Sequence, residues 1–203
     1  GEEGKVVAFE PMLANNQICS AISAHNNRNP FVVYPKACSG AVVAEGSGAT
    51  KSTVRLKNFN MWHDHPLHWH DRYTLEETTG NSGEEFNSEA FTMEHLEPGE
   101  GVAPAVTLDA AAAELGLEAR LDRIFLQING HEFKCLKSGE ATLRRFYPTI
   151  TMIFAHVGED EGSRAEKGEA MDSWLRAVGY DSIVKHALPT SEEWIATASQ
   201  KQK

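Results

Sequence analysis

The sequence predicts an α/β fold in which helices cover both faces of a mostly parallel sheet, with a polar insertion in the middle of the chain. Short apolar strands alternate with amphipathic helices in the first forty residues, and the same alternation returns after residue 104. The segment between is rich in Gly, Ser, Glu and Asn. With 203 residues, the chain exceeds one small domain but falls short of two ordinary ones. We therefore expect a single domain.

The first block predicts a strand, a helix and a second strand. Lys5 to Glu10 combines β-favouring apolar residues with a terminal acid, and Pro11 ends it. The stretch from Leu13 to Asn26 predicts a helix, because apolar positions recur there at helical spacing, at Ile18, Ala21, Ile22 and His25. Phe31 to Tyr34 is the next apolar strand. Strands joined through a helix in this way run parallel.

The middle of the chain, residues 41–103, forms the expected insertion. Thr53 to Lys57 alternates in polarity and predicts a half-exposed strand, whereas Leu75 to Gly101 lacks periodicity and predicts a long loop or an inserted lobe. Four histidines stand close together in it, at His63, His65, His68 and His70. Imidazoles spaced two apart on an extended segment can bind zinc, nickel or iron as a pair. We expect no resident metal, because no motif fixes the geometry. A metal-binding protein remains an alternative, as does a lid over an acceptor pocket.

The second block repeats the alternation of helix and strand. Its expected elements are a helix capped by Thr107 and stopped by Gly116, a strand from Leu121 to Ile128, a helix from Gly130 to before Pro148, a strand from Thr149 to Ala155, a helix from Glu166 to Val178 and a strand from Tyr180 to His186. Leu121 to Ile128 is apolar on both faces, which is typical of an interior strand. Residues 191–203 predict a short, mostly polar tail.

Charge and composition exclude several classes of partner. Lys and Arg number 19 against 29 Asp and Glu, which gives a net charge of −10. This excess of acid argues against binding to nucleic acid or to anionic lipid. No apolar run approaches the roughly 18 residues of a membrane helix. The three cysteines, Cys19, Cys38 and Cys135, predict free thiols in a reducing compartment and favour a cytoplasmic location.

The ends of the predicted strands mark the candidate site, because ligands in open α/β sheets bind beyond the carboxyl ends of parallel strands. These positions are Glu10, Ala37 to Ser39, Gln127 to Gly130 and His156. The two oxygens of a carboxylate match the vicinal diol of a ribose. An acid in the place of Glu10 can also simply cap a helix or face solvent.

Two separated blocks resemble the FkbM-type methyltransferases, which use S-adenosyl-L-methionine. Gly4 to Pro11 and Phe31 to Ser39 resemble the second and third strand regions of that family. The resemblance resumes at Val106 to Asp109 and continues through Leu121 to Gly139 and Pro148 to His156. It implies a Rossmann-like class I methyltransferase fold. The domain would span residues 1–190, with family-like blocks at 1–40 and 104–190.

The resemblance also implies roles for individual residues. Glu10 would hold the ribose of S-adenosyl-L-methionine, Ala37 and Cys38 would border the adenine, and Gln127 would contact the cofactor. The acceptor would be a hydroxyl of a sugar or another small molecule. Candidates around it are Asn129, His131 and His156.

The chain departs from the family pattern in two ways. Gln127 and Asn129 stand where the family carries two acids, and neither amide can act as a carboxylate base. Methyl transfer from a sulfonium needs little beyond placement, so activity and its loss are both open. The family's first strand and glycine-rich turn also have no counterpart. We expect an upstream segment or a partner chain to supply that strand, or else a rearranged sheet. A non-catalytic interaction module is the alternative function.

Overall fold

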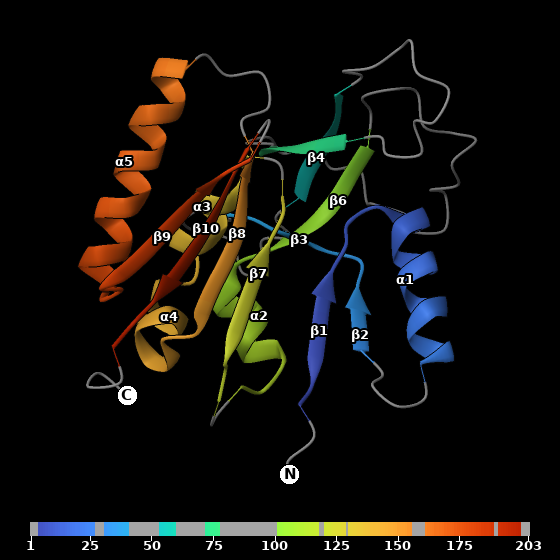
Figure 1. The fold of residues 1–203 in the computed structure, drawn as a ribbon. Coiled ribbons are helices and arrows are strands. Elements are labelled where there is room, and N and C mark those ends of the chain that lie inside the picture. The colour runs from blue at the N-terminus through green and yellow to red at the C-terminus, as the bar shows by residue number, and fades with distance from the viewer. Residues whose placement is uncertain are drawn as a thin grey trace, which may run out of the picture. The chain divides into compact units, whose positions relative to one another are not determined.

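The computed structural model describes residues 4–26, 31–40, 53–59, 72–77, 101–117, 120–128, 130–155, 161–188 and 191–199. The chain divides into two compact units, Gly1–Val106 and Thr107–Lys203. The first contains β1 (Val6–Phe9), α1 (Leu13–His25), β2 (Phe31–Tyr34), β3 (Ala37–Cys38), β4 (Thr53–Phe59), β5 (Arg72–Glu77) and β6 (Gly101–Val106) (Figure 1). The second contains α2 (Leu108–Glu114), β7 (Arg123–Leu126), α3 (Glu132–Lys137), α4 (Glu140–Phe146), β8 (Thr149–Ala155), α5 (Glu161–Val178), β9 (Ser182–Ala187) and β10 (Ser191–Thr197).

The first unit begins with the expected strand, helix and strand. β1 and β2 pair in parallel, with Val6 opposite Phe31. Ser23 of α1 joins the helix to β2, since its hydroxyl accepts a hydrogen bond from the Phe31 amide (2.8 Å) and donates one to the Phe31 carbonyl. The apolar positions that predicted the helix face outward, with Ile18 59% and Ile22 55% exposed. The helix is therefore confirmed, but its periodicity does not mark its buried side.

A second sheet of this unit has the order β3-β6-β4-β5. β3 and β6 are parallel, whereas β4 is antiparallel to both of its neighbours. The strand expected at Thr53 is confirmed as β4. The long loop expected from Leu75 to Gly101 is wrong at both ends, because β5 extends to Glu77 and β6 starts at Gly101. Gly101 and Pro104 hid β6, since both residue types are disfavoured in strands.

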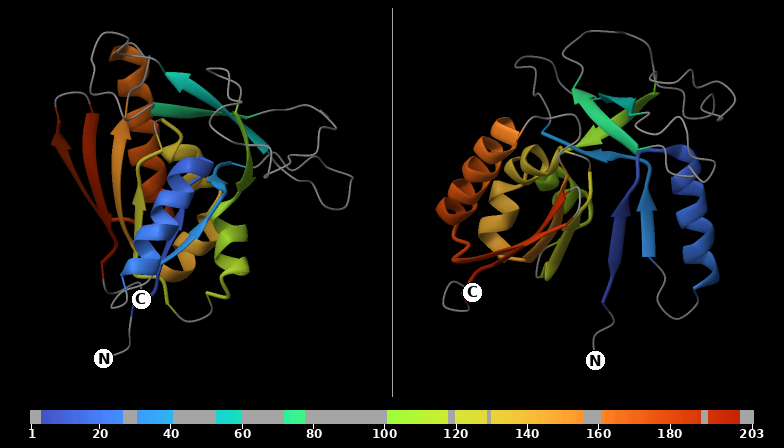
Figure 2. Two further views of the ribbon diagram at one scale, coloured as in Figure 1. Left: turned by 90° about the vertical axis from the view of Figure 1, so that its right-hand side faces the viewer. Right: turned by 45° about the horizontal axis from the view of Figure 1, so that its top comes forward.

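The second unit is built on a sheet with the order β7-β8-β10-β9. β7 and β8 are parallel, and β10 is antiparallel to β8 and to β9. In the views of Figure 2, α3, α4 and α5 lie on one side of this sheet. Across the whole described chain, three of the seven strand pairs are parallel. The α/β class is thus confirmed, while the mostly parallel, Rossmann-like sheet with helices on both faces is not.

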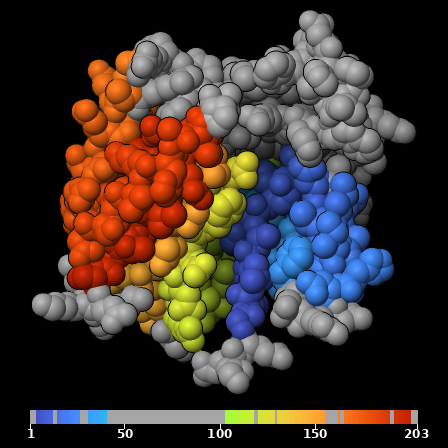
Figure 3. Space-filling model, viewed as in Figure 1, coloured from blue at the N-terminus to red at the C-terminus, as the bar shows by residue number. Residues whose placement is uncertain are grey.

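The core of the second unit lies between its sheet and its helices. Leu126, Met152 and Trp194 occupy neighbouring positions on adjacent strands and are at most 6% exposed. The opposite face of the sheet carries a row in which Phe125 is 63% and Val184 45% exposed, and Figure 3 shows β9 and β10 side chains (red) at the surface. β7 is also shorter than expected and alternates between exposed and buried. The expected strand is therefore confirmed in part, and among the described strands β7 pairs with β8 alone.

The end of the chain contradicts the expected polar tail. Ser191–Thr197 form β10, in which Trp194 is 1% and Ala196 0% exposed while Glu193 and Ile195 are half-buried. Buried and half-buried residues alternate along the segment with the period of a strand. The strand pairs with β8 on one side and with β9 on the other. Its high proportion of polar residues hid this alternation. None of the helices in the described parts of the chain has the length and apolar character to cross a membrane.

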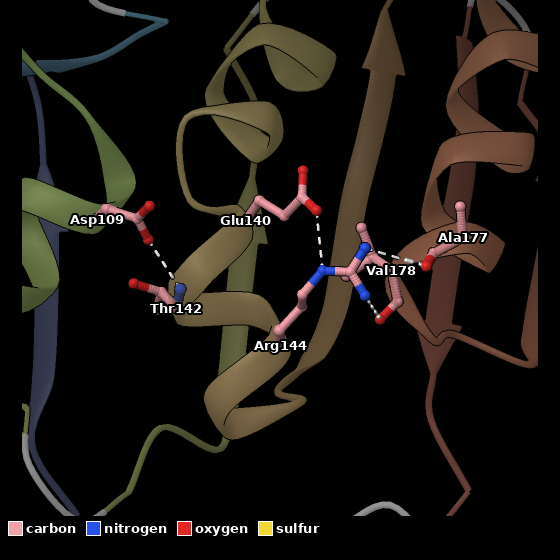
Figure 4. Close-up of polar contacts among 6 residues, drawn as sticks. All are labelled: Asp109, Glu140, Thr142, Arg144, Ala177 and Val178. Carbon is pink, nitrogen blue, oxygen red and sulfur yellow. Dashed lines mark hydrogen bonds and ion pairs between the residues drawn. The ribbon is translucent and has the colours of Figure 1, made fainter.

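The single helix expected between Gly130 and Pro148 is wrong, because the structure has α3 and α4 with a break at Ser138 and Gly139. The start of α2 fills this break. The Leu108 amide donates to the Ser138 hydroxyl (3.0 Å), and the Asp109 amide donates to the Ser138 carbonyl (3.2 Å). In return, an Asp109 carboxylate oxygen accepts from the Thr142 amide (2.8 Å, Figure 4). Asp109 thereby caps α4, which Gly139 cannot do without a side chain.

Arg144 ties α4 to the end of α5 (Figure 4). Its guanidinium donates to the Val178 and Ala177 carbonyls, both at 3.1 Å, and to Glu140 at 2.8 Å. The two carbonyls belong to the last turn of α5, where helical acceptors lack intrahelical partners. The cation also complements the negative end of the helix.

We expect Arg144→Met to lower the free energy of unfolding by about 1 to 2 kcal/mol, because it removes charged donors from two helix-end carbonyls. Since the Arg144 side chain is 46% exposed, water replaces part of the loss. Denaturant unfolding followed by circular dichroism measures the change. Arg120→Met is the control, since the Arg120–Asp122 pair is 68% and 60% exposed and should contribute under about 0.5 kcal/mol. Equal losses in the two variants would contradict the proposed capping.

Candidate functional site

Glu10 lies immediately after β1, at its carboxyl end. The Glu10 amide donates to the Tyr34 carbonyl (3.0 Å), which continues the pairing of β1 with β2 by one residue. Its carboxylate accepts from the Met12 amide at 2.8 Å and interacts with the Asn15 side chain. Met12 is the residue before α1, so the carboxylate lies at the start of that helix. The predicted position of Glu10 at the end of a strand is therefore confirmed, and its side chain accepts from the amide of the residue that precedes the helix.

Burial changes the acidity of Glu10. Desolvation raises the pKa of its carboxyl above the ordinary value, and the hydrogen bonds from Met12 and Asn15 offset only part of that rise. The carboxylate is half-buried, and the Met12 amide and the Asn15 side chain occupy two of its roughly four acceptor positions. Acceptor capacity remains for further donors. A polar ligand with two neighbouring hydroxyls would be a suitable partner.

Ala37 and Cys38 form β3, which lies three residues beyond the end of β2. Ala37 pairs with Ala105 of β6 and is 1% exposed. Only its backbone and the next residues can border a ligand. The expectation of three free thiols is wrong: Cys19 is free, whereas Cys38 and Cys135 are disulfide-bonded. Cysteine spacing along a sequence does not determine covalent state.

Gln127 and His131 flank the turn that follows β7, at its carboxyl end. Gln127 is exposed and His131 is half-buried. Gly130 adopts φ +96°, a conformation that residues with a side chain rarely take. The His131 carbonyl accepts from the Cys135 amide (2.9 Å) and so starts α3. The turn thus presents Gln127 to solvent beside the first residues of the helix.

Glu132 holds this turn, a role that the sequence analysis did not assign. Its carboxylate is 0% exposed and accepts from the Ile128 amide (3.0 Å) through Oε1 and from the Gly130 amide (2.9 Å) through Oε2. These two amides are engaged by the protein itself. The signal available in the sequence was an acid two residues after a glycine at a strand-to-helix turn.

The remaining candidates lie outside the described residues. They are Asn129, His156 and the four histidines His63, His65, His68 and His70. Among the residues that the structure does describe, no group of three or more metal-ligating side chains comes together. The metal-binding alternative therefore stays a prediction.

The described candidates fall in two sets, one in each unit. Glu10, Ala37 and Cys38 belong to the first unit, where the ends of β1, β2 and β3 follow one another along the chain. Gln127 and His131 belong to the second unit, with Glu132 between the turn and α3. The first set contains a half-buried carboxylate, and the second contains an exposed amide and an imidazole whose two ring nitrogens are buried.

One known protein family matches most of the chain. The family described as methyltransferase FkbM domain matches residues 1–182. No curated protein and no solved structure matches the chain.

Proposed function

This chain belongs to the FkbM methyltransferase domain family, and from that premise we propose that it methylates a hydroxyl oxygen of a sugar or another small molecule. The proposed methyl donor is S-adenosyl-L-methionine. When bound, this cofactor supplies a methyl group on a sulfonium that needs no further activation. The observation that carries the proposal is the half-buried Glu10 carboxylate at the carboxyl end of β1, within the family match.

The residues of the two sets take different roles in this proposal. Glu10 accepts hydrogen bonds from the ribose hydroxyls, while the backbone at Ala37 and Cys38 borders the adenine. Gln127 contacts the cofactor through its exposed amide. Asn129, His131 and His156 surround the acceptor, and an imidazole there would take the proton that the acceptor hydroxyl loses on methylation. Because Gln127 and Asn129 carry no charge, histidine is the better base in this site.

The proposal extends to the organisation of the chain. We propose that residues 1–190 form one methyltransferase-like domain of Rossmann type and that residues 41–103 cover the acceptor. The net charge of −10 favours a small neutral or cationic acceptor over nucleic acid or an anionic membrane. Among the described strands, β1 pairs only with β2, and β7 only with β8. This supports the proposal that another strand, from a partner chain or a further segment, completes the sheet.

Calorimetric titration with S-adenosyl-L-methionine tests the cofactor. We expect Glu10→Gln to weaken binding by about 1 to 3 kcal/mol, or about 5- to 150-fold, because it removes a charged acceptor. The glutamine oxygen can still accept from the Met12 amide, so the start of α1 is kept. Glu169→Ala, an exposed position on α5, is the control. Neither heat nor a thermal shift in the unaltered chain at about 1 mM ligand would overturn the proposed cofactor.

The same titration across pH gives a second readout of Glu10. Since burial raises the pKa of this carboxyl, it protonates at a higher pH than an ordinary glutamate as the solution is acidified. Affinity that depends on the ionised form is then present above the raised pKa and is lost as the pH falls through it. Glu10→Gln should abolish this step. A step that persists in the variant would assign it to another group.

A non-catalytic interaction module is the second candidate. The observation that favours it is the row of side chains on the outer face of the β7–β10 sheet. There Phe125 is 63% and Val184 45% exposed, and Ile195 lies between them. Large apolar side chains gathered on one face are typical of contact surfaces. Absence of cofactor binding in the titration would favour this reading.

A further inference from the structure

The carboxylate of Glu132 is fully buried and faces the backbone of the turn after β7. Each of its two oxygens accepts from a different amide, Ile128 at 3.0 Å and Gly130 at 2.9 Å. Burying a carboxylate is costly unless it is hydrogen-bonded. A small apolar side chain would fill this position at lower cost if packing were all that it required. What the carboxylate provides is therefore its two hydrogen bonds to backbone amides.

The two bonds fix the backbone at two points, two residues apart, directly after the strand. Ile128 is held at the first point and Gly130, with φ +96°, at the second. Gln127 is the exposed residue just before the first point. The amides themselves are turned toward Glu132 and are not offered to a ligand. The turn can therefore bind a ligand through side chains that stand on a fixed backbone.

We propose that Glu132 is a positioning residue, whose buried carboxylate holds the turn after β7 in the form that places Gln127 against the cofactor. This inference rests on the proposed function, which puts Gln127 in the cofactor site. Glu132 does not touch the ligand. It acts through the Ile128 and Gly130 amides, and its loss lets the turn take other conformations. The affinity for S-adenosyl-L-methionine then falls because binding has to order the turn again.

Glu132→Gln is the decisive substitution, because the side chain keeps its length and shape. One amide oxygen still accepts, but the NH2 group meets a backbone N–H, and two donors cannot bond. We expect hydrogen exchange at one or both of the Ile128 and Gly130 amides to become at least about tenfold faster. The dissociation constant for S-adenosyl-L-methionine should rise by about tenfold or more.

Glu140→Gln is the matched control. Glu140 is the first residue of α4, as Glu132 is of α3, but its carboxylate pairs with the exposed Arg144 guanidinium at 2.8 Å. We expect its dissociation constant to stay within about twofold of the unaltered chain. Glu132→Asp is the second variant, since it keeps both acceptors on a shorter arm and should bind the cofactor more tightly than Glu132→Gln. A merely structural role predicts equal affinity in all three folded variants, which would overturn the proposal.

The unaltered chain separates this inference from the proposed function. If S-adenosyl-L-methionine does not bind, the proposed function fails, and this inference fails with it. If it binds, the amide resonances of Gln127, Ile128 and Gly130 should shift, while those of β9 should stay in place. Binding without a shift at the turn would refute the roles of Gln127 and Glu132 and would leave the proposed cofactor in place. This measurement needs no variant, so it decides the question even if Glu132→Gln does not fold.

Discussion

Trp194→Ala is expected to lower the free energy of unfolding by about 3 to 5 kcal/mol, the range for removing a large buried aromatic side chain. Trp194 is 1% exposed and has its ring 5.4 Å from that of Phe154, and the Lys185 ammonium lies 3.9 Å from its ring centroid. Its indole N–H also donates to Glu192 at 2.8 Å. Alanine would leave a cavity between the sheet and α5, where Gly168 faces the indole.

Denaturant unfolding followed by far-ultraviolet circular dichroism measures this loss. Ile195→Ala is the matched control, because Ile195 is the next residue of β10, is half-buried and points to the opposite face of the sheet. We expect a smaller loss there, about 1 kcal/mol. A Trp194→Ala loss no greater than that of Ile195→Ala would show that β10 does not belong to the core.

Gly139→Ala is expected to destabilise the chain by about 1 to 3 kcal/mol through overpacking. A Cβ atom on Gly139 would stand 2.4 Å from Cδ2 and 2.6 Å from Cβ and Cγ of Leu108. Rotation of the Leu108 side chain can move Cγ and Cδ2, but Cβ is fixed to the backbone. The φ of −122° at Gly139 is open to alanine, so the cost comes from the contact with α2 and not from backbone strain.

A double-variant cycle with Leu108→Ala identifies the cause. Removing Cγ and Cδ2 relieves part of the contact, so the two losses should add to more than that of the double variant. Gly4→Ala serves as a control, since no atom lies within 4 Å of a Cβ placed there. Strictly additive losses would mean that Gly139 is required for another reason than its contact with Leu108.

The sequence predicted correctly those helix ends that are marked by a capping residue or a glycine at the end itself. Thr107 caps α2 through its side chain (3.0 Å to the Ala110 amide), and Gly116 and Gly179 end helices at φ +60° and +123°. These features act within one turn of the chain. The α3–α4 break could not be predicted in this way, because its causes are Leu108 and Asp109, some thirty residues earlier. β10 was missed because five of its seven residues are Ser, Glu, Thr or Ala.

The candidate site was predictable only in part, for a related reason. The acid at a strand end located Glu10, and the family pattern located the turn after β7. The spacing from Gly130 marks the position of Glu132, but its role depends on a side chain turned back onto amides that precede it. Sequence alone also left the direction of the Glu10 pKa open, since burial and hydrogen bonding act in opposite senses.

The hydrogen bonds between the start of α2 and the break between α3 and α4 have a consequence for folding. The Leu108–Ser138 and Asp109–Thr142 hydrogen bonds join residues 30 and 33 positions apart. The helices α2, α3 and α4 have only seven, six and seven residues. Helices this short do not persist alone in water. None of the three can therefore nucleate independently. We therefore expect the three helices to depend on one another for their stability.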